Sequence, residues 1–476
     1  MTLNVTTTNL SAKAANEWAM QVRAIGQLDR AIEMLQQFAE QLPNEGAVWC
    51  NLGVCMMEVG RLDEAIACYR KAIGLAPWLP EPRGALIMAL MYSEKHTQAD
   101  VEAEQAGYQA WLDGFITPRT SWPKRAEGKK VRVAYVSGDL NDHAMSRFML
   151  PVLSNHTDAV EVVVYATGKW DWMTQRIGEG PGKGIWRDCR DMSDEDLDAL
   201  IFGDEIDVLI DLGGITAGGR PLVVARKPSP VQISYLSHPG DTGMKAHDYF
   251  LSDRVLGLGP RALELSSYWT FAKSPEFPPV EPVPHEGVVF GSLANFAKIT
   301  DEMLVAWRKI LDGVEGSRLI MHAPDGSARE KVLRILPANR VEFVGRQSYV
   351  EYLKTWNRVD IGVDTYPWAG GTTAAEALAM GIPLVTMRGP KVASRSAASI
   401  SAACGRGDCV VDSIAGYIAL AKQLAEGIDH LAGMRGRFIE SLPSSRLFDI
   451  KTHVAELEAC YRSAWMRYCG RGRGSG

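Results

Sequence analysis

A seven-residue pattern occurs twice near the start of the chain, as GQLDRAI at residues 26–32 and as GRLDEAI at residues 60–66. A proline follows each copy, Pro43 after the first and Pro77 after the second. The glycines and the prolines therefore both return after about 34 residues, a period typical of arrays of paired helices. Each unit is predicted to be a helical hairpin that ends at its proline.

This period is that of the tetratricopeptide repeat, and the second copy carries more of the expected residues, namely Trp49, Leu52, Gly53, Ala65, Tyr69 and Ala72. Small residues at such places let neighbouring helices approach, while the large ones fill the seam. We expect helix pairs from Ala12 to about Tyr92, with a weaker third unit after Pro80. A helix over Ala99–Phe115 should dock this arm, residues 1–116, on the next domain.

Length and composition limit the other possibilities. A chain of 476 residues exceeds what one core usually serves, so two or three domains are expected. A net charge of −6 without a long basic run argues against a nucleic-acid or membrane-surface partner. Without an apolar run of ~18 residues or a charged-then-apolar leader, the expected location is the cytoplasm. The eight cysteines and nine histidines are dispersed, so we expect no metal site.

Short apolar strands alternate with helical stretches beyond the linker at residues 117–130. The predicted strands of the first half are Val131–Ser137, Val160–Tyr165, Asp207–Asp211 and Val231–Tyr235, and those of the second half are Val288–Gly291, Arg318–Met321, Arg340–Val344, Asp360–Asp364 and Pro383–Thr386. Such alternation predicts an α/β fold with two doubly wound parallel sheets. A proline-rich bridge from Pro275 to Pro284 separates the halves and leaves a cleft between them, where ligands of such sheets bind.

The turn Gly370–Thr373 is the first candidate site, because it joins the strand ending at Asp364 to a predicted helix over Ala374–Met380. Glycine lets the backbone approach a ligand closely, and the free N–H groups of a helix start attract an anion such as a diphosphate. Thr372 or Thr373 can cap this helix. The alternative is an ordinary strand-to-helix turn with a threonine cap.

Two further side chains could serve the same chemistry. Lys298 follows the first strand of the second half and could place a cation near a leaving phosphate. His143 lies in a polar loop before a helix of the first half, where it could act as a base or orient an acceptor. The alternatives are a surface lysine and a histidine that caps or packs on its helix.

Taken together, these motifs resemble the O-GlcNAc transferase and SPINDLY-like family of inverting GT-B glycosyltransferases over nearly the whole chain. Besides the arm, the residues that carry the resemblance are Tyr135–Asp139 with His143, Ile210–Gly214, Pro228–Gln232, Asn295–Lys298, Gly370–Thr373, Met387–Gly389 and Ala393–Arg395. The resemblance implies a tetratricopeptide solenoid followed by two Rossmann-like lobes. Residues 117–274 would form the acceptor-side lobe, and residues 275–476 the nucleotide-sugar lobe with a final helix that crosses back.

The resemblance also implies an activity, namely metal-independent transfer of a sugar to Ser or Thr of an acceptor protein that the helical arm recruits. The donor would be UDP-GlcNAc, a co-substrate, with no other cofactor. By position, the donor would be held by Asn295, Lys298, Gly370, Gly371, Thr372, Thr373 and Glu376, and His143 would lie beside the acceptor and the sugar. Lys298 would contact the diphosphate, the two threonines would hold phosphate, and Glu376 would stand where the family keeps a carboxylate for the ribose.

Three positions depart from the animal enzymes of that family. Gly371 replaces a histidine, and Tyr349 and Tyr352 lie where those enzymes use Lys and His around the nucleotide. Each change removes a hydrogen-bond donor near the base or the sugar. Two alternatives therefore stay open: another donor such as GDP-fucose or a CMP-nonulosonate with a flagellin-type acceptor, or an inactive tetratricopeptide binding scaffold.

Overall fold

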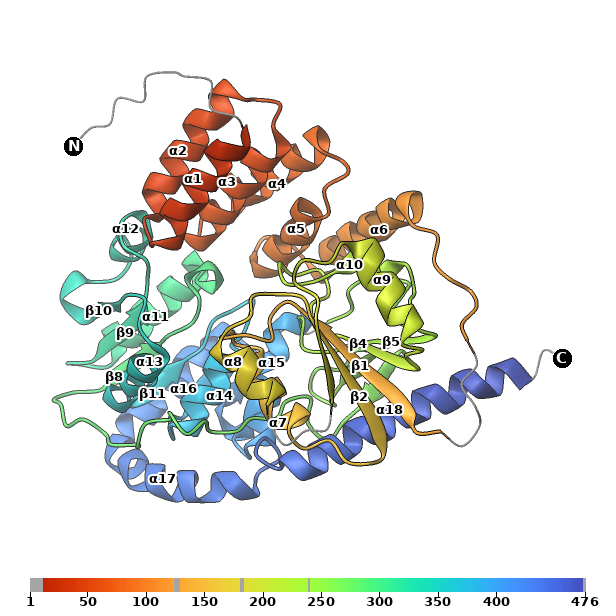
Figure 1. Ribbon diagram of the computed structural model, residues 1–476. Helices are drawn as coiled ribbons and strands as arrows, with labels where there is room; N and C mark the ends of the chain where they lie inside the picture. Colours follow the sequence, from red (N-terminus) through yellow and green to blue (C-terminus); the bar gives the residue numbers. More distant parts are fainter. Residues whose placement is uncertain (1–11, 124–128, 180–183, 239, 474–476) are drawn as a thin grey trace.

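The computed structural model describes residues 12–123, 129–179, 184–238 and 240–473. It begins with paired antiparallel helices, which Figure 1 shows as an arm above the rest of the chain. These helices are α1 (Ala12–Ala24), α2 (Leu28–Gln41), α3 (Gly46–Glu58), α4 (Leu62–Leu75), α5 (Glu81–Tyr92) and α6 (Gln98–Phe115). A helix after Pro80 and a helix over most of residues 99–115 are therefore present, as predicted.

Glycines and one large aromatic side chain explain how the arm packs. Gly26 and Gly60 have φ values of +84° and +74°, which end α1 and α3 in turns that other residues rarely adopt. Gly53 faces Tyr69, because a Cβ at Gly53 would lie 2.6 Å from the tyrosine ring. The repeat positions read from the sequence thus form the seam between α3 and α4.

The first lobe is built on a parallel sheet in the order β3-β2-β1-β4-β5-β6-β7. Its strands are β1 (Val131–Ser137), β2 (Val160–Ala166), β3 (Ile185–Asp188), β4 (Val208–Asp211), β5 (Val231–Ser234), β6 (Tyr249–Ser252) and β7 (Ala262–Glu264). Its helices are α7 (Ser146–Leu153), α8 (Trp172–Gly178), α9 (Asp194–Gly203) and α10 (Pro221–Ala225). Tyr135 and Val136 belong to different hydrophobic clusters, so both faces of the sheet are covered.

The second lobe has a parallel sheet in the order β10-β9-β8-β11-β12-β13. Its strands are β8 (Val289–Ser292), β9 (Arg318–His322), β10 (Val341–Val344), β11 (Ile361–Val363), β12 (Leu384–Met387) and β13 (Val410–Val411). Its helices are α11 (Asp301–Gly313), α12 (Ser327–Leu333), α13 (Tyr349–Thr355), α14 (Thr372–Ala379), α15 (Ser396–Ala403), α16 (Ile414–Glu426) and α17 (Ile428–Ser441). The predicted fold of two doubly wound parallel sheets behind a helical arm is therefore confirmed.

The last helix, α18 (Ile450–Arg473), crosses back to the first lobe, as Figure 1 shows. The Tyr461 hydroxyl lies 3.1 Å from that of Tyr135 on β1, and the Thr157 hydroxyl donates to Glu458 at 2.7 Å. The two sheets are thus tied by the chain end as well as by the bridge between β7 and β8.

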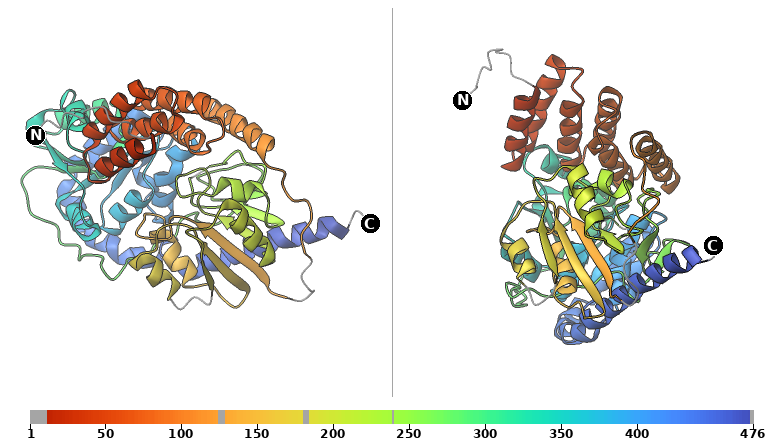
Figure 2. Two further views of the ribbon diagram at one scale, coloured as in Figure 1. Left: turned by 45° about the horizontal axis from the view of Figure 1, so that its top comes forward. Right: turned by 45° about the vertical axis from the view of Figure 1, so that its right-hand side comes forward.

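The arm runs over both lobes, as Figure 2 shows from two further directions. Lys245 of the first lobe forms a 2.6 Å ion pair with Asp113 on α6. On the second lobe, the buried Lys391 ammonium donates to the Leu90 and Ser93 carbonyls at the end of α5, at 2.9 and 2.6 Å. The arm is therefore fixed to both sheets.

Candidate functional site

A cavity of about 720 Å³ opens where the arm meets the second lobe, near a loop of the first lobe. A volume of this size is within the range of small-molecule sites. Its wall lies at the carboxyl ends of β8, β9 and β10, where ligands of doubly wound sheets bind. Among the residues that line it are Arg23, Leu28 and Glu58 of the arm, Asp142 of the first lobe, and Asn295, Phe296, His322, Arg346, Tyr349 and Tyr352 of the second lobe.

The start of α14 lies in the same lobe, after β11. Gly371, Thr372 and Thr373 are half-exposed, whereas the helix from Ala374 to Ala379 is buried. The first N–H groups of a helix have no acceptor within it, so this start can receive an anion. The predicted threonine cap is wrong, because the N-cap residue is Gly371 and the cap forms no side-chain hydrogen bond.

Gly370 was predicted to help hold the nucleotide sugar, but its contacts are with the protein itself. Its N–H donates to Asp364 Oδ1 at 2.8 Å, so this amide is not a free donor for phosphate. A Cβ at Gly370 would lie 2.8 Å from Thr373 Oγ1 and 3.0 Å from Asp364 Oδ1. Gly370 is therefore needed for the close packing of the turn, and the helix start beyond it offers the free amides.

Lys298 ends a short 3₁₀ turn, η1 (Phe296–Lys298), directly after β8. Its Nζ donates to the Ala369 carbonyl at 3.2 Å, which places the ammonium beside the Gly370–Thr373 turn. Burial lowers the pKa of Lys298 to about 8, and the nearby Asp364 carboxyl opposes this effect. Lys298 is thus a half-buried cation next to a helix start, not a solvated surface lysine.

Asn295 is the N-cap residue of the same 3₁₀ turn and connects it with the cavity. Its Oδ1 accepts the Ala297 N–H at 3.0 Å, and its exposed side chain lines the cavity. Four consecutive residues, 295–298, therefore connect the cavity with the Lys298 contact at the α14 start.

Glu376 lies in α14 and is only 3% exposed. Burial raises its pKa to about 7, and hydrogen bonds from Tyr352 and Tyr349 oppose this shift. The Tyr352 hydroxyl, at 2.7 Å, lies between this carboxyl and the cavity that Tyr352 lines. Tyr352 therefore connects the buried Glu376 carboxyl with the cavity.

His143 lies on the first-lobe loop before α7, next to Asp142, which lines the cavity. Its ring is exposed, and Nδ1 accepts the Met145 N–H at 3.3 Å. This bond holds the ring against the backbone just before α7, whose N-cap residue is Met145.

Three features of the site were missed by sequence reasoning. The arm contributes part of the cavity wall, the Arg147 guanidinium of α7 lies 3.9 Å above the Tyr349 ring, and Trp269 packs on Gly371, where a Cβ would lie 3.5 Å from the indole. Each contact joins residues far apart in the sequence, so no local pattern could reveal it. The only signal was the position of Arg147 at the start of a helix next to the polar loop.

Two kinds of feature are absent from the described residues. None of their helices has both the length and the apolar content needed to cross a membrane. In the same part of the chain, no three His, Cys, Asp or Glu side chains gather as metal ligands would.

The chain is similar to several known proteins. It is 33% identical to the "Probable UDP-N-acetylglucosamine--peptide N-acetylglucosaminyltransferase SPINDLY" of Petunia hybrida over 374 residues, which are 73% of this chain and 40% of that protein. It is 28% identical to the SEC protein of Arabidopsis thaliana, named in the same way, over 80% of this chain and 42% of that one. The chain thus spans less than half the length of these relatives.

A solved structure extends the likeness to the whole fold. A Thermobaculum terrenum O-GlcNAc transferase mutant superposes with a TM-score of 0.89 at 28% identity, over 97% of this chain and 92% of that one. The tetratricopeptide repeat model matches residues 46–78, and the model of glycosyl transferase family 41 matches residues 116–270 and 281–457. The chain therefore belongs to glycosyl transferase family 41.

Proposed function

We propose that the protein is an inverting, metal-independent O-glycosyltransferase that moves a sugar from a nucleotide diphosphate to Ser or Thr of an acceptor protein. The observation that carries this proposal is the placement of the Lys298 ammonium beside the half-exposed start of α14, next to a cavity large enough for a nucleotide. The names of the relatives favour UDP-N-acetylglucosamine as the donor. We divide the chain into the arm at 1–116 and lobes at 117–274 and 275–476.

In this proposal the nucleoside lies in the cavity and the diphosphate lies at the start of α14. The backbone N–H groups and hydroxyls of Thr372 and Thr373, with the amide of Gly371, receive the phosphates. The positive end of the helix dipole adds to this attraction. Asn295 contacts the nucleotide from η1, and Glu376 acts on the ribose side through Tyr352.

The reaction is a single displacement at the anomeric carbon. The acceptor oxygen forms a bond to this carbon while the bond to the departing phosphate oxygen breaks, and the acceptor proton leaves to a base. Negative charge grows on the departing diphosphate, and Lys298 and the N–H groups at the start of α14 stabilise this charge. A well-placed donor of this kind contributes about 3 kcal/mol to catalysis.

His143 is the proposed acceptor-side residue, because its loop reaches the cavity from the other lobe through Asp142. An exposed imidazole can orient the hydroxyl and receive its proton. The helical arm would recruit the acceptor protein, since the grooves of such solenoids bind extended segments.

Titration calorimetry with UDP, GDP and CDP, followed by a transfer assay, tests the proposal. We expect UDP to bind best, and UDP-N-acetylglucosamine to add one sugar mass to an acceptor protein in intact-mass spectra. Tighter binding of GDP or CDP would replace the donor and keep the enzyme. Absence of binding by all three would leave only the inactive scaffold.

A further inference from the structure

The turn between α3 and α4 of the arm, at Gly60, rests directly on the 3₁₀ turn that carries Lys298. A Cβ at Gly60 would lie 3.1 Å from the Phe296 ring and 3.2 Å from Lys331 Nζ. Phe296 is the first residue of η1 and is 1% exposed. The arm therefore covers one side of the turn from which Lys298 reaches Ala369.

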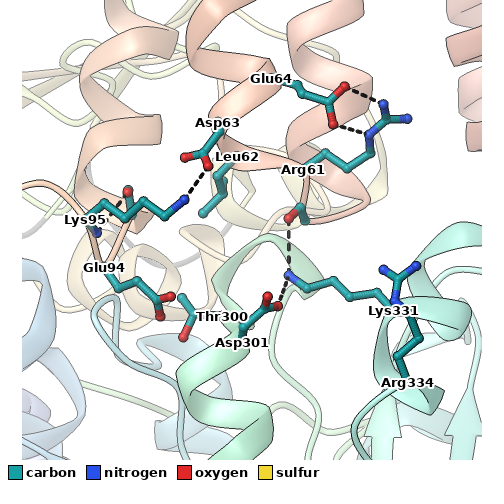
Figure 3. Close-up of a pocket in the computed structure, with 12 residues that line it drawn as sticks. Arg61, Leu62, Asp63, Glu64, Glu94, Lys95, Thr300, Asp301, Lys331 and Arg334 are labelled. Carbon is teal, nitrogen blue, oxygen red and sulfur yellow. Dashed lines mark hydrogen bonds and ion pairs between the residues drawn. The ribbon is translucent and has the colours of Figure 1, made fainter.

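The Lys331 ammonium lies between the arm and Asp301, as Figure 3 shows. Lys331 Nζ on α12 lies 3.2 Å from the Gly60 carbonyl, 3.2 Å from the Ile299 carbonyl and 3.2 Å from Asp301 Oδ1. An ammonium has three N–H donors, so these three acceptors use all of them. The Lys331 side chain is 16% exposed, which shields the contacts from water.

Two of these acceptors follow the proposed leaving-group cation, Lys298, within three residues of the chain. Ile299 directly follows Lys298, and Asp301 begins α11, whose N-cap hydroxyl on Thr300 lies 3.4 Å from the Tyr366 carbonyl. Tyr366 belongs to the loop that leads to Gly370. Lys331 thus holds the backbone that follows Lys298, through the Ile299 carbonyl. Asn295 holds the backbone that precedes Lys298, through the Ala297 N–H.

The neighbouring turns of the arm are held in the same way. Arg346 of the second lobe donates to the Ala24 carbonyl at 3.4 Å, and Asp29 of α2 accepts the Ser327 N–H at the start of α12 at 2.7 Å. Lys391 holds the end of α5, as described above. The arm cannot lift away from η1 at Gly60 without breaking contacts at the adjacent repeats.

We propose that Lys331 is a positioning residue for the transfer reaction, and that the arm turn at Gly60 acts with it to fix Lys298 against the diphosphate site. This inference rests on the proposed function and adds a second role to the arm, which then shapes the donor site besides recruiting the acceptor. Without the Lys331 contacts, residues 295–299 can shift. A shift of about 1 Å in a catalytic group can cost a hundredfold in rate.

The test is a mutant cycle read out by UDP affinity. Lys331→Met should weaken UDP binding on the order of tenfold, because Lys298 loses its fixed place. On a Lys298→Met background the same change should cost less than about twofold, since coupled residues are not additive. A merely structural role would weaken binding equally in both backgrounds and would overturn the proposal.

Two further variants and one control keep the result clear. Lys331→Arg retains a cation with several donors and should restore most of the affinity. Gly60→Ala pushes on Phe296 and Lys331 from the arm and should reproduce the loss even where Lys331→Met fails to fold. Arg334→Met is the matched control, because Arg334 is an exposed cation of the same region of Figure 3.

The outcomes separate the two proposals. A parent protein that binds no UDP contradicts the proposed function, and with it this inference. A parent that binds UDP, with Lys331→Met and Gly60→Ala equal to Arg334→Met, contradicts the positioning role alone.

Discussion

The two lobes place very different candidate side chains near the same cavity. On the second lobe, Lys298 is half-buried, donates to the Ala369 carbonyl and stands on a turn that the arm covers. On the first lobe, His143 is exposed on a loop, and its ring Nδ1 accepts the Met145 N–H at 3.3 Å. The proposed donor side is thus built by burial, whereas the proposed acceptor side is open.

This difference fits the chemistry that each side would perform. In the proposed reaction, charge develops on the leaving diphosphate, and groups that stabilise such charge work best when they are already oriented and shielded from water. An acceptor protein brings its own surface to the other side, so a histidine there can remain exposed until the acceptor covers it. The predictions below probe this contrast.

Lys298→Met should have the largest effect. We expect the transfer rate to fall by about 10²–10³, the cost of removing one preorganised donor from a developing charge. The melting temperature should not fall, because burial already disfavours this ammonium in the folded protein, as its lowered pKa indicates. Lys309→Met, at an exposed position of α11, is the matched control and should leave the rate unchanged. Equal rates for the two variants would contradict a role for Lys298.

A pair of glycine variants tests whether the turn before α14 is as closely packed as its contacts indicate. Gly370→Ala places a Cβ 2.8 Å from Thr373 Oγ1, whereas Gly371→Ala brings nothing closer than 3.5 Å. Overpacking of this kind costs about 1–3 kcal/mol. Urea unfolding should show that loss for Gly370→Ala and a smaller one for Gly371→Ala. Similar values for both would mean that the turn can relax.

Raising the pH should separate function from stability at Lys298. The pKa of Lys298 is about 8 in the folded chain, compared with 10.5 for an ordinary lysine. UDP affinity should therefore fall as the pH rises from 7 to 9, by a factor approaching ten per unit above the pKa if the charge carries the binding. Calorimetry across this range measures the fall, and Lys298→Met should show no such dependence.

The contribution of Lys298 to stability should change with pH in the opposite direction to its contribution to UDP affinity. Between pH 8 and pH 10.5 the unfolded chain keeps the Lys298 proton that the folded chain has lost. The unfolded state then binds more protons, so this group makes the free energy of unfolding rise with pH. Urea unfolding of the parent and of Lys298→Met over this window isolates the contribution, and a parent that gains nothing relative to the variant would refute the lowered pKa.

Local patterns were sufficient to predict most of the fold. The repeat spacing located α1 to α4 because each hairpin buries the same small and aromatic positions, and the apolar strands β1 and β8 were recognised because parallel strands are buried on both faces. The edge strand β3 was missed because its four residues, Ile-Trp-Arg-Asp, mix polar and apolar side chains that remain partly exposed. The two-residue β13 is too short for any pattern.

The site was less predictable, because its geometry depends on long-range contacts. Lys298 and the Gly370–Thr373 turn were expected to act together, and the 3.2 Å bond to Ala369 places them side by side. The threonine cap was wrong, since a glycine can end the loop without any side-chain bond and leave the helix start open. The contact between Gly60 and Lys331 joins residues 271 positions apart, and nothing in either local sequence signals it.

His143 offers the smallest and most discriminating test of the contrast between the lobes. His143→Ala removes both the contact with the Met145 N–H and the imidazole, whereas His143→Asn can keep an acceptor for that N–H but cannot take a proton. A hydrogen bond of this kind contributes about 1 kcal/mol, so urea unfolding should separate Ala from Asn by no more than that amount. UDP affinity should stay at the parental value in both, because the donor side is built without this residue.

If transfer falls in both variants alike, the imidazole takes part in the chemistry. If Asn retains the parental rate, the histidine has only a structural role, and the base of the reaction is solvent or a group of the acceptor itself.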